Sequence, residues 1–174
     1  MDNNTQKPIT DKKYAVTVFI WLFLFTAVFA VIGAYVSDRF GILDGISFYG
    51  RYDGLTSSFA TRANAVLISS VSCLVQLMFL YMLSYSALLI PGSVIITGLR
   101  GFMLGASYSI ADSAAEFIQI AAYAVICLGI CITTSKLTNC RKESVGTAVA
   151  KKTIILTATA GFSVITEFLL SFMI

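Results

Sequence analysis

Long apolar stretches alternate with shorter polar segments along the whole chain, and each apolar stretch contains at most one charged residue. A helix of about 20 apolar residues crosses a hydrocarbon core about 30 Å thick. Five stretches meet this length, namely residues 14–36, 63–83, 93–111, 117–135 and 153–172. The pattern predicts an all-α polytopic membrane protein, in which a bundle of five transmembrane helices forms a single domain over residues 1–174.

Composition supports the same class of protein. Hydrophobic residues make up 57% of the chain and charged residues 12%, and the mean hydropathy is +0.86. A soluble domain carries about twice this share of charged residues. The first apolar stretch is longer than the core of a signal peptide and lacks a clean cleavage site, so we expect an uncleaved anchor. The predicted location is the cell membrane, with the lipid bilayer as the surrounding medium.

The orientation follows from the placement of Lys and Arg. Eight of them flank the spans on one side, against three on the other, and Lys and Arg accumulate in cytoplasmic loops. We therefore expect a cytoplasmic N-terminus, an extracytoplasmic loop over residues 37–62, a basic cytoplasmic loop over residues 136–152 and an extracytoplasmic C-terminus. The eight residues are Lys7, Lys12, Lys13, Lys136, Arg141, Lys142, Lys151 and Lys152.

The apolar run from Ala63 to Ala111 is too long for one span. As a single helix it would measure roughly 70 Å, more than twice the hydrocarbon core. Pro91 and Gly92 form the only proline-containing breaker in this run. Proline clashes with the preceding helical turn and glycine frees the backbone. These two residues are therefore the predicted hairpin break between the second and third spans.

The third span carries a face of small residues. At 100° per residue, Gly98, Gly101, Gly105 and Ser109 fall within about 80° of one another. Such a face lets two helix backbones approach closely. Arg100 projects to the opposite side, so we expect this span to lie between neighbours at the centre of the bundle. The small face could pack within the chain or between copies in a homo-oligomer.

Two charges lie inside predicted spans, Arg100 in the third and Glu167 in the fifth. A charge near the bilayer centre costs about 2.5–3.5 kcal/mol on insertion scales, and intramembrane charges are candidate functional groups. Arg100 could extend to the headgroups or be held by a buried partner. One hypothesis is that Arg100 pairs with Glu167.

Catalytic and cofactor signatures are missing from the sequence. The chain has no His, no cysteine pair with zinc-ribbon spacing and no phosphate-binding loop. Nothing beyond charge suggests nucleic-acid binding. We therefore predict a protein that is not an enzyme, binds no metal or cofactor and has no nucleic-acid partner.

Several short patterns in order along the chain resemble the stage II sporulation protein M family. A proline is followed nine residues later by an arginine and then by Gly-x-x-x-Gly, and the other matches lie near both ends. The residues that carry the resemblance are Gly33 and Ala34, Phe59 and Asn64, Pro91, Arg100, Gly101 and Gly105, and the segment from Ala160 to Glu167.

The resemblance implies a bacterial integral membrane protein of sporulation and engulfment. Such a protein acts as a non-enzymatic scaffold that anchors peptidoglycan hydrolases, the stage II sporulation proteins D and P, at the septal membrane. The alternative is a channel-like or permease-like transport component that uses Arg100 and Glu167 to line a polar route for an ion or a small solute.

Overall fold

The computed structural model describes residues 7–40, 59–109, 111, 114–140 and 145–173. These residues form five α-helices and contain no strand. The helices are α1 (Lys7–Phe40), α2 (Phe59–Leu83), α3 (Leu89–Ser109), α4 (Ala114–Asn139) and α5 (Val145–Met173). The all-helical prediction is therefore confirmed for the described part of the chain.

Four helices are long and apolar enough to cross a membrane. They contain the segments Lys13–Arg39, Leu89–Ser109, Ile120–Asn139 and Gly146–Thr166. Within the described part of α2, the apolar segment is shorter and covers Ser70–Leu83. By length and composition, four of the described helices are therefore able to cross a membrane, as expected of a membrane protein.

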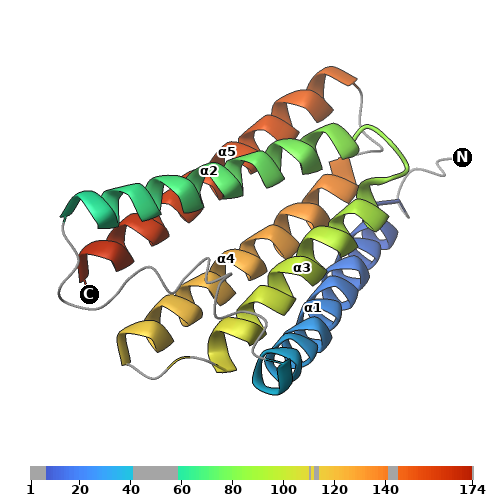
Figure 1. The fold of residues 1–174 in the computed structure, drawn as a ribbon. Coiled ribbons are helices and arrows are strands. Elements are labelled where there is room, and N and C mark those ends of the chain that lie inside the picture. Colours follow the sequence, from blue (N-terminus) through green and yellow to red (C-terminus); the bar gives the residue numbers. More distant parts are fainter. Residues whose placement is uncertain (1–6, 41–58, 110, 112–113, 141–144, 174) are drawn as a thin grey trace, which may run out of the picture.

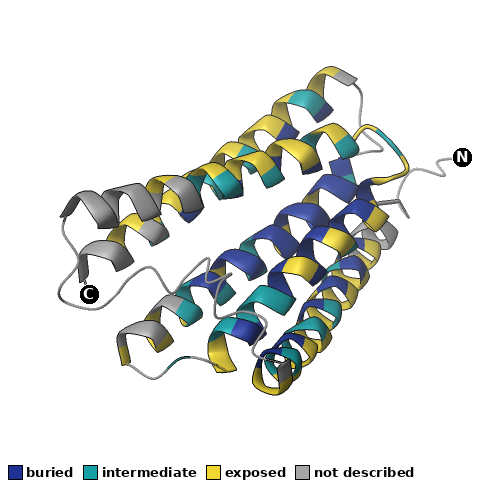
Figure 2. Ribbon diagram, viewed as in Figure 1, coloured by how far each residue is buried: buried dark blue, intermediate teal, exposed yellow. Residues whose placement is uncertain are grey.

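The helices pack side by side along their length (Figure 1). α3 contacts α1, α4 and α2, while α5 contacts α2 and α4. Buried residues concentrate on α3 and α4, whereas α1, α2 and α5 keep broad exposed faces (Figure 2). This confirms the prediction that the third span lies between neighbours. Apolar exposed faces are what a lipid-embedded bundle requires, because lipid tails contact them directly.

Several predicted boundaries need correction. α1 begins at Lys7 and ends at Phe40, so it extends beyond residues 14–36 at both ends. The basic loop predicted over residues 136–152 is largely helical, because α4 continues to Asn139 and α5 begins at Val145. α3 ends at Ser109, two residues before the predicted end of its span. Most of the predicted extracytoplasmic loop, residues 41–58, lies outside the described residues.

The hairpin break was predicted too far along the chain. The turn between α2 and α3 is formed by residues 84–88, and α3 has already begun at Leu89. Pro91 lies in the first turn of α3, where a missing backbone N–H removes no helical hydrogen bond. The hydroxyl of Ser86 closes the turn, because it donates to the Leu83 carbonyl and accepts from the Leu88 N–H. Serine, rather than the Pro-Gly pair, thus satisfies the backbone where the chain reverses.

Candidate functional site

α1 and α3 approach each other closely through glycines. A Cβ atom built on Gly105 would lie 1.7 Å from the backbone oxygen of Ala30, and one on Gly101 would lie 2.3 Å from that of Thr26. A Cβ on Gly33 of α1 would lie 2.0 Å from the backbone oxygen of Phe102. Because the obstructing atoms belong to the backbone, only glycine fits at these three positions. The glycines therefore fasten two helices of the same chain.

Two other members of the predicted small face behave differently. A Cβ on Gly98 would lie 3.3 Å from a ring carbon of Phe25, so the contact there is with a side chain. Ser109 is exposed, and its hydroxyl donates to the Ala106 carbonyl of its own helix. The prediction that Ser109 belongs to the packing face is therefore wrong. Gly33 completes the contact instead, and its spacing after Ala30 on α1 is the sequence signal for it.

On the other side of α3, Arg100 is buried with 5% of its surface exposed. Its Nε donates to Oε1 of Gln76 on α2. The guanidinium carbon lies 5.2 Å from the ring centroid of Tyr123 on α4, a cation–π distance. Of the two alternatives for this arginine, the structure shows the buried one. Neither Gln76 nor Tyr123 is among the predicted site residues, because each lies in an apolar helix where its sequence position carries no signal for this contact.

Two further predicted positions, Glu167 and Asn64, can be assigned only to their helices. Glu167 lies on α5 and Asn64 on α2, and the side chains of both lie outside the described part of the structure. The pairing of Arg100 with Glu167 therefore stays a prediction. Gly92, which was predicted to lie in the hairpin, is part of α3 and is buried against α2, since a Cβ there would lie 2.2 Å from Cδ1 of Leu83.

A second buried cation lies at the end of the bundle where α5 begins. Lys152 is 3% exposed, and its Nζ donates to the Ser84 carbonyl at 3.1 Å. The ammonium also lies 3.9 Å from the ring centroid of Tyr85. Tyr85 in turn donates its phenolic hydrogen to the Tyr81 oxygen at 2.8 Å, and this bond raises the pKa of Tyr85. The hydrogen bond thus favours the protonated phenol of Tyr85, whose ring faces the Lys152 side chain.

Polar contacts also connect the other helices. Ser135 near the end of α4 donates to the Ala15 carbonyl near the start of α1 at 2.7 Å. The hydroxyls of Thr133 on α4 and Thr159 on α5 lie 2.6 Å apart. Together with the bonds from Arg100 and Lys152, these contacts give every helix at least one polar link to a neighbour. In lipid such links hold helices together, because water does not compete for the bonding groups.

Comparison of the chain with protein-family models, with curated proteins and with solved structures finds no significant match.

Proposed function

We propose that the chain is a five-span integral membrane scaffold that holds partner proteins at the cell membrane and catalyses no reaction itself. As the resemblance to the stage II sporulation protein M family implies, the proposed partners are membrane-anchored peptidoglycan hydrolases, the stage II sporulation proteins D and P. The N-terminus is cytoplasmic and the C-terminus extracytoplasmic. α2 is the additional span, since its 25 residues extend about 37 Å.

One observation carries this proposal: the intramembrane arginine is used in contacts between helices of its own chain. Arg100 is buried between α2, α3 and α4 by its contacts with Gln76 and Tyr123. It does not line the apolar groove that Leu74 and Leu77 of α2 form with Leu156 of α5. A residue that gates a transport route needs access to that route, whereas this arginine acts as a fixed support. The geometry therefore favours a scaffold over a transporter.

The surface available to a partner differs from the glycine face that the sequence suggested for helix contacts. The glycine face of α3 is covered by α1, so it cannot bind a partner helix at the same time. The exposed faces of α1 and α5 offer Val31, which is 71% exposed, and Ile154, which is 67% exposed. We assign partner contacts to these faces and to the predicted extracytoplasmic loop.

The orientation is supported by the way basic segments gather at one end. Ser135 bonds to Ala15, and Lys152 bonds to Ser84, so α1, α4, α5 and the α2–α3 turn meet there. Six lysines of the predicted cytoplasmic segments lie on these same helices, namely Lys7, Lys12 and Lys13 on α1, Lys136 on α4, and Lys151 and Lys152 on α5. An end that is enriched in lysine stays on the cytoplasmic side during insertion.

Partner capture tests the scaffold directly. A photoreactive residue replaces Ile154 or Val31, both exposed, and a matched variant carries it at Leu137, which is fully buried. After irradiation of native membranes, we expect the exposed positions to capture cell-wall hydrolases and the buried position to give only bonds within the chain. The scaffold proposal fails if the exposed positions capture no cell-wall hydrolase and the pure protein carries ion or solute flux in liposomes.

Impermeant maleimide labelling tests the orientation. In a cysteine-free background, Gly146→Cys places a thiol at the basic end and Ser109→Cys at the opposite end, both at exposed sites. We expect intact cells to label only Ser109→Cys, and opened cells to label both variants. Labelling of Gly146→Cys alone in intact cells would reverse the proposed orientation.

A further inference from the structure

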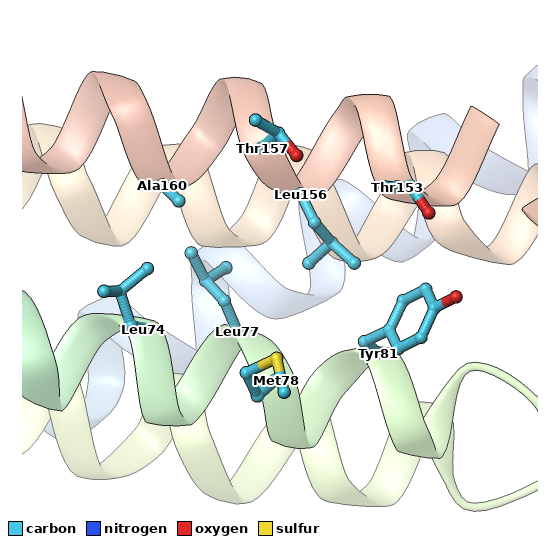
Figure 3. A pocket seen from close by; sticks show the side chains of 8 residues that line it. All are labelled: Leu74, Leu77, Met78, Tyr81, Thr153, Leu156, Thr157 and Ala160. Atoms are coloured by element: carbon cyan, nitrogen blue, oxygen red, sulfur yellow. The ribbon is translucent and has the colours of Figure 1, made fainter. Parts of the chain in front are cut away.

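An apolar groove with a volume of about 330 Å³ lies between α2 and α5 (Figure 3). Four residues from each helix line it. Along each helix the lining covers seven residue steps, which correspond to about 10 Å. The lining residues are Leu74, Leu77, Met78 and Tyr81 on α2 and Thr153, Leu156, Thr157 and Ala160 on α5.

The dimensions of the groove limit what it can hold. A volume of about 330 Å³ over a length of about 10 Å gives a groove roughly 6 Å wide. A helix with its side chains is about 10–12 Å wide, so it cannot enter. A single hydrocarbon chain is much thinner and matches the apolar walls formed by Leu74, Leu77 and Leu156.

One end of the groove is polar and positively charged. Tyr81 and Thr153 face each other there (Figure 3). The Tyr81 oxygen accepts a hydrogen bond from Tyr85, so the phenolic hydrogen of Tyr81 is directed to the Thr153 side, at the polar end of the groove. Lys152, next to Thr153 in the chain, places its ammonium 3.9 Å from the centroid of the Tyr85 ring. This end lies at the lysine-rich end of the bundle.

We propose that this groove binds one acyl chain of an anionic phospholipid, whose headgroup phosphate accepts a hydrogen bond from Tyr81 in the field of Lys152. The apolar length holds the chain, and the charge selects the headgroup. Basic pockets between transmembrane helices bind anionic headgroups in this way. The site is independent of the scaffold proposal, since neither requires the other.

The test measures lipid retention by the purified full-length protein with native mass spectrometry. The probes are phosphatidylglycerol and phosphatidylcholine with identical acyl chains, which differ in net charge but not in the hydrocarbon part. We expect wild-type protein to retain one phosphatidylglycerol about tenfold more tightly than phosphatidylcholine. Two substitutions on α5 form a matched pair: Ala160→Phe fills the groove, and Ala158→Phe adds the same ring at an exposed position outside it.

Ala160→Phe should abolish retention of both lipids, while Ala158→Phe should leave it at the wild-type level. Tyr81→Phe and Lys152→Gln should reduce the preference for phosphatidylglycerol to about one while an acyl chain is still bound. If Lys152→Gln does not fold, Tyr81→Phe carries this part of the test, because its ring remains in place. Equal retention of the two lipids by wild-type protein overturns the proposal. So does normal retention by Ala160→Phe, or a change of oligomeric state on that substitution, which would assign the groove to a second copy.

Discussion

Gly105→Ala tests how closely α1 and α3 approach. The added Cβ would lie 1.7 Å from the Ala30 backbone oxygen, whereas real Cβ contacts are essentially never shorter than 3.0 Å. The two helices must therefore move apart by at least about 1.3 Å at this point. No side chain can rotate to relieve the contact, because the obstructing atom belongs to the backbone of α1.

The expected free-energy cost follows from overpacking, which destabilises well-packed proteins by about 1–3 kcal/mol. We expect the upper value, about 3 kcal/mol, because rigid backbone atoms meet. Alanine is also a better helix former than glycine by about 1 kcal/mol. Gly161→Ala on α5 carries the same gain but no clash, because nothing lies within 4 Å of the added atom. The difference between the two variants isolates the steric cost.

Thermal unfolding in mild detergent measures this difference. For a chain of this length 1 kcal/mol corresponds to about 2–4 °C, so Gly105→Ala should melt about 6–12 °C below Gly161→Ala. Adding Ala30→Gly should not restore stability, because the clash is with the backbone oxygen and not with the Ala30 methyl group. Equal melting temperatures for the two variants, or rescue by Ala30→Gly, would refute the close packing.

Three further outcomes follow from the polar contacts. Gln76→Leu should lower the free energy of unfolding by about 1–3 kcal/mol, because the buried Arg100 loses its acceptor, whereas Gln76→Glu should retain the bond; denaturant titration compares the two. Lys152→Met should speed hydrogen exchange in the turn at residues 84–88, because the ammonium no longer holds a carbonyl there; exchange rates equal to wild type would contradict this role. A double-mutant cycle with Thr133→Val and Thr159→Val should give a coupling of about 0.6 kcal/mol, the average for such bonds in membranes, and zero coupling would remove this link.

Apolar patterning predicted the helical class, a membrane protein and the approximate spans without any structure. Twenty apolar residues in a row leave few alternatives, because every backbone group in lipid must be bonded within a helix or a closed barrel. Helical periodicity also placed Gly98, Gly101 and Gly105 on one side of a span and Arg100 on the other. The predicted ends of the helices were less accurate. Pro91 suggested a break, yet proline is compatible with the first turn of a helix. The turn instead lies upstream, where Ser86 bonds to the backbone.

Which groups contact one another became apparent only from the packing of the helices. Periodicity gives the face on which a side chain lies but not the helix opposite it, so nothing in the order of residues indicated that Gly105 faces Ala30. The same reason hid the contact of Arg100 with Tyr123 and the docking of Lys152 against Ser84, which join segments distant along the chain. In the sequence, a lysine near the end of a span indicates only membrane orientation. Lys152 is buried and bonded to the Ser84 carbonyl because α5 packs against the α2–α3 turn.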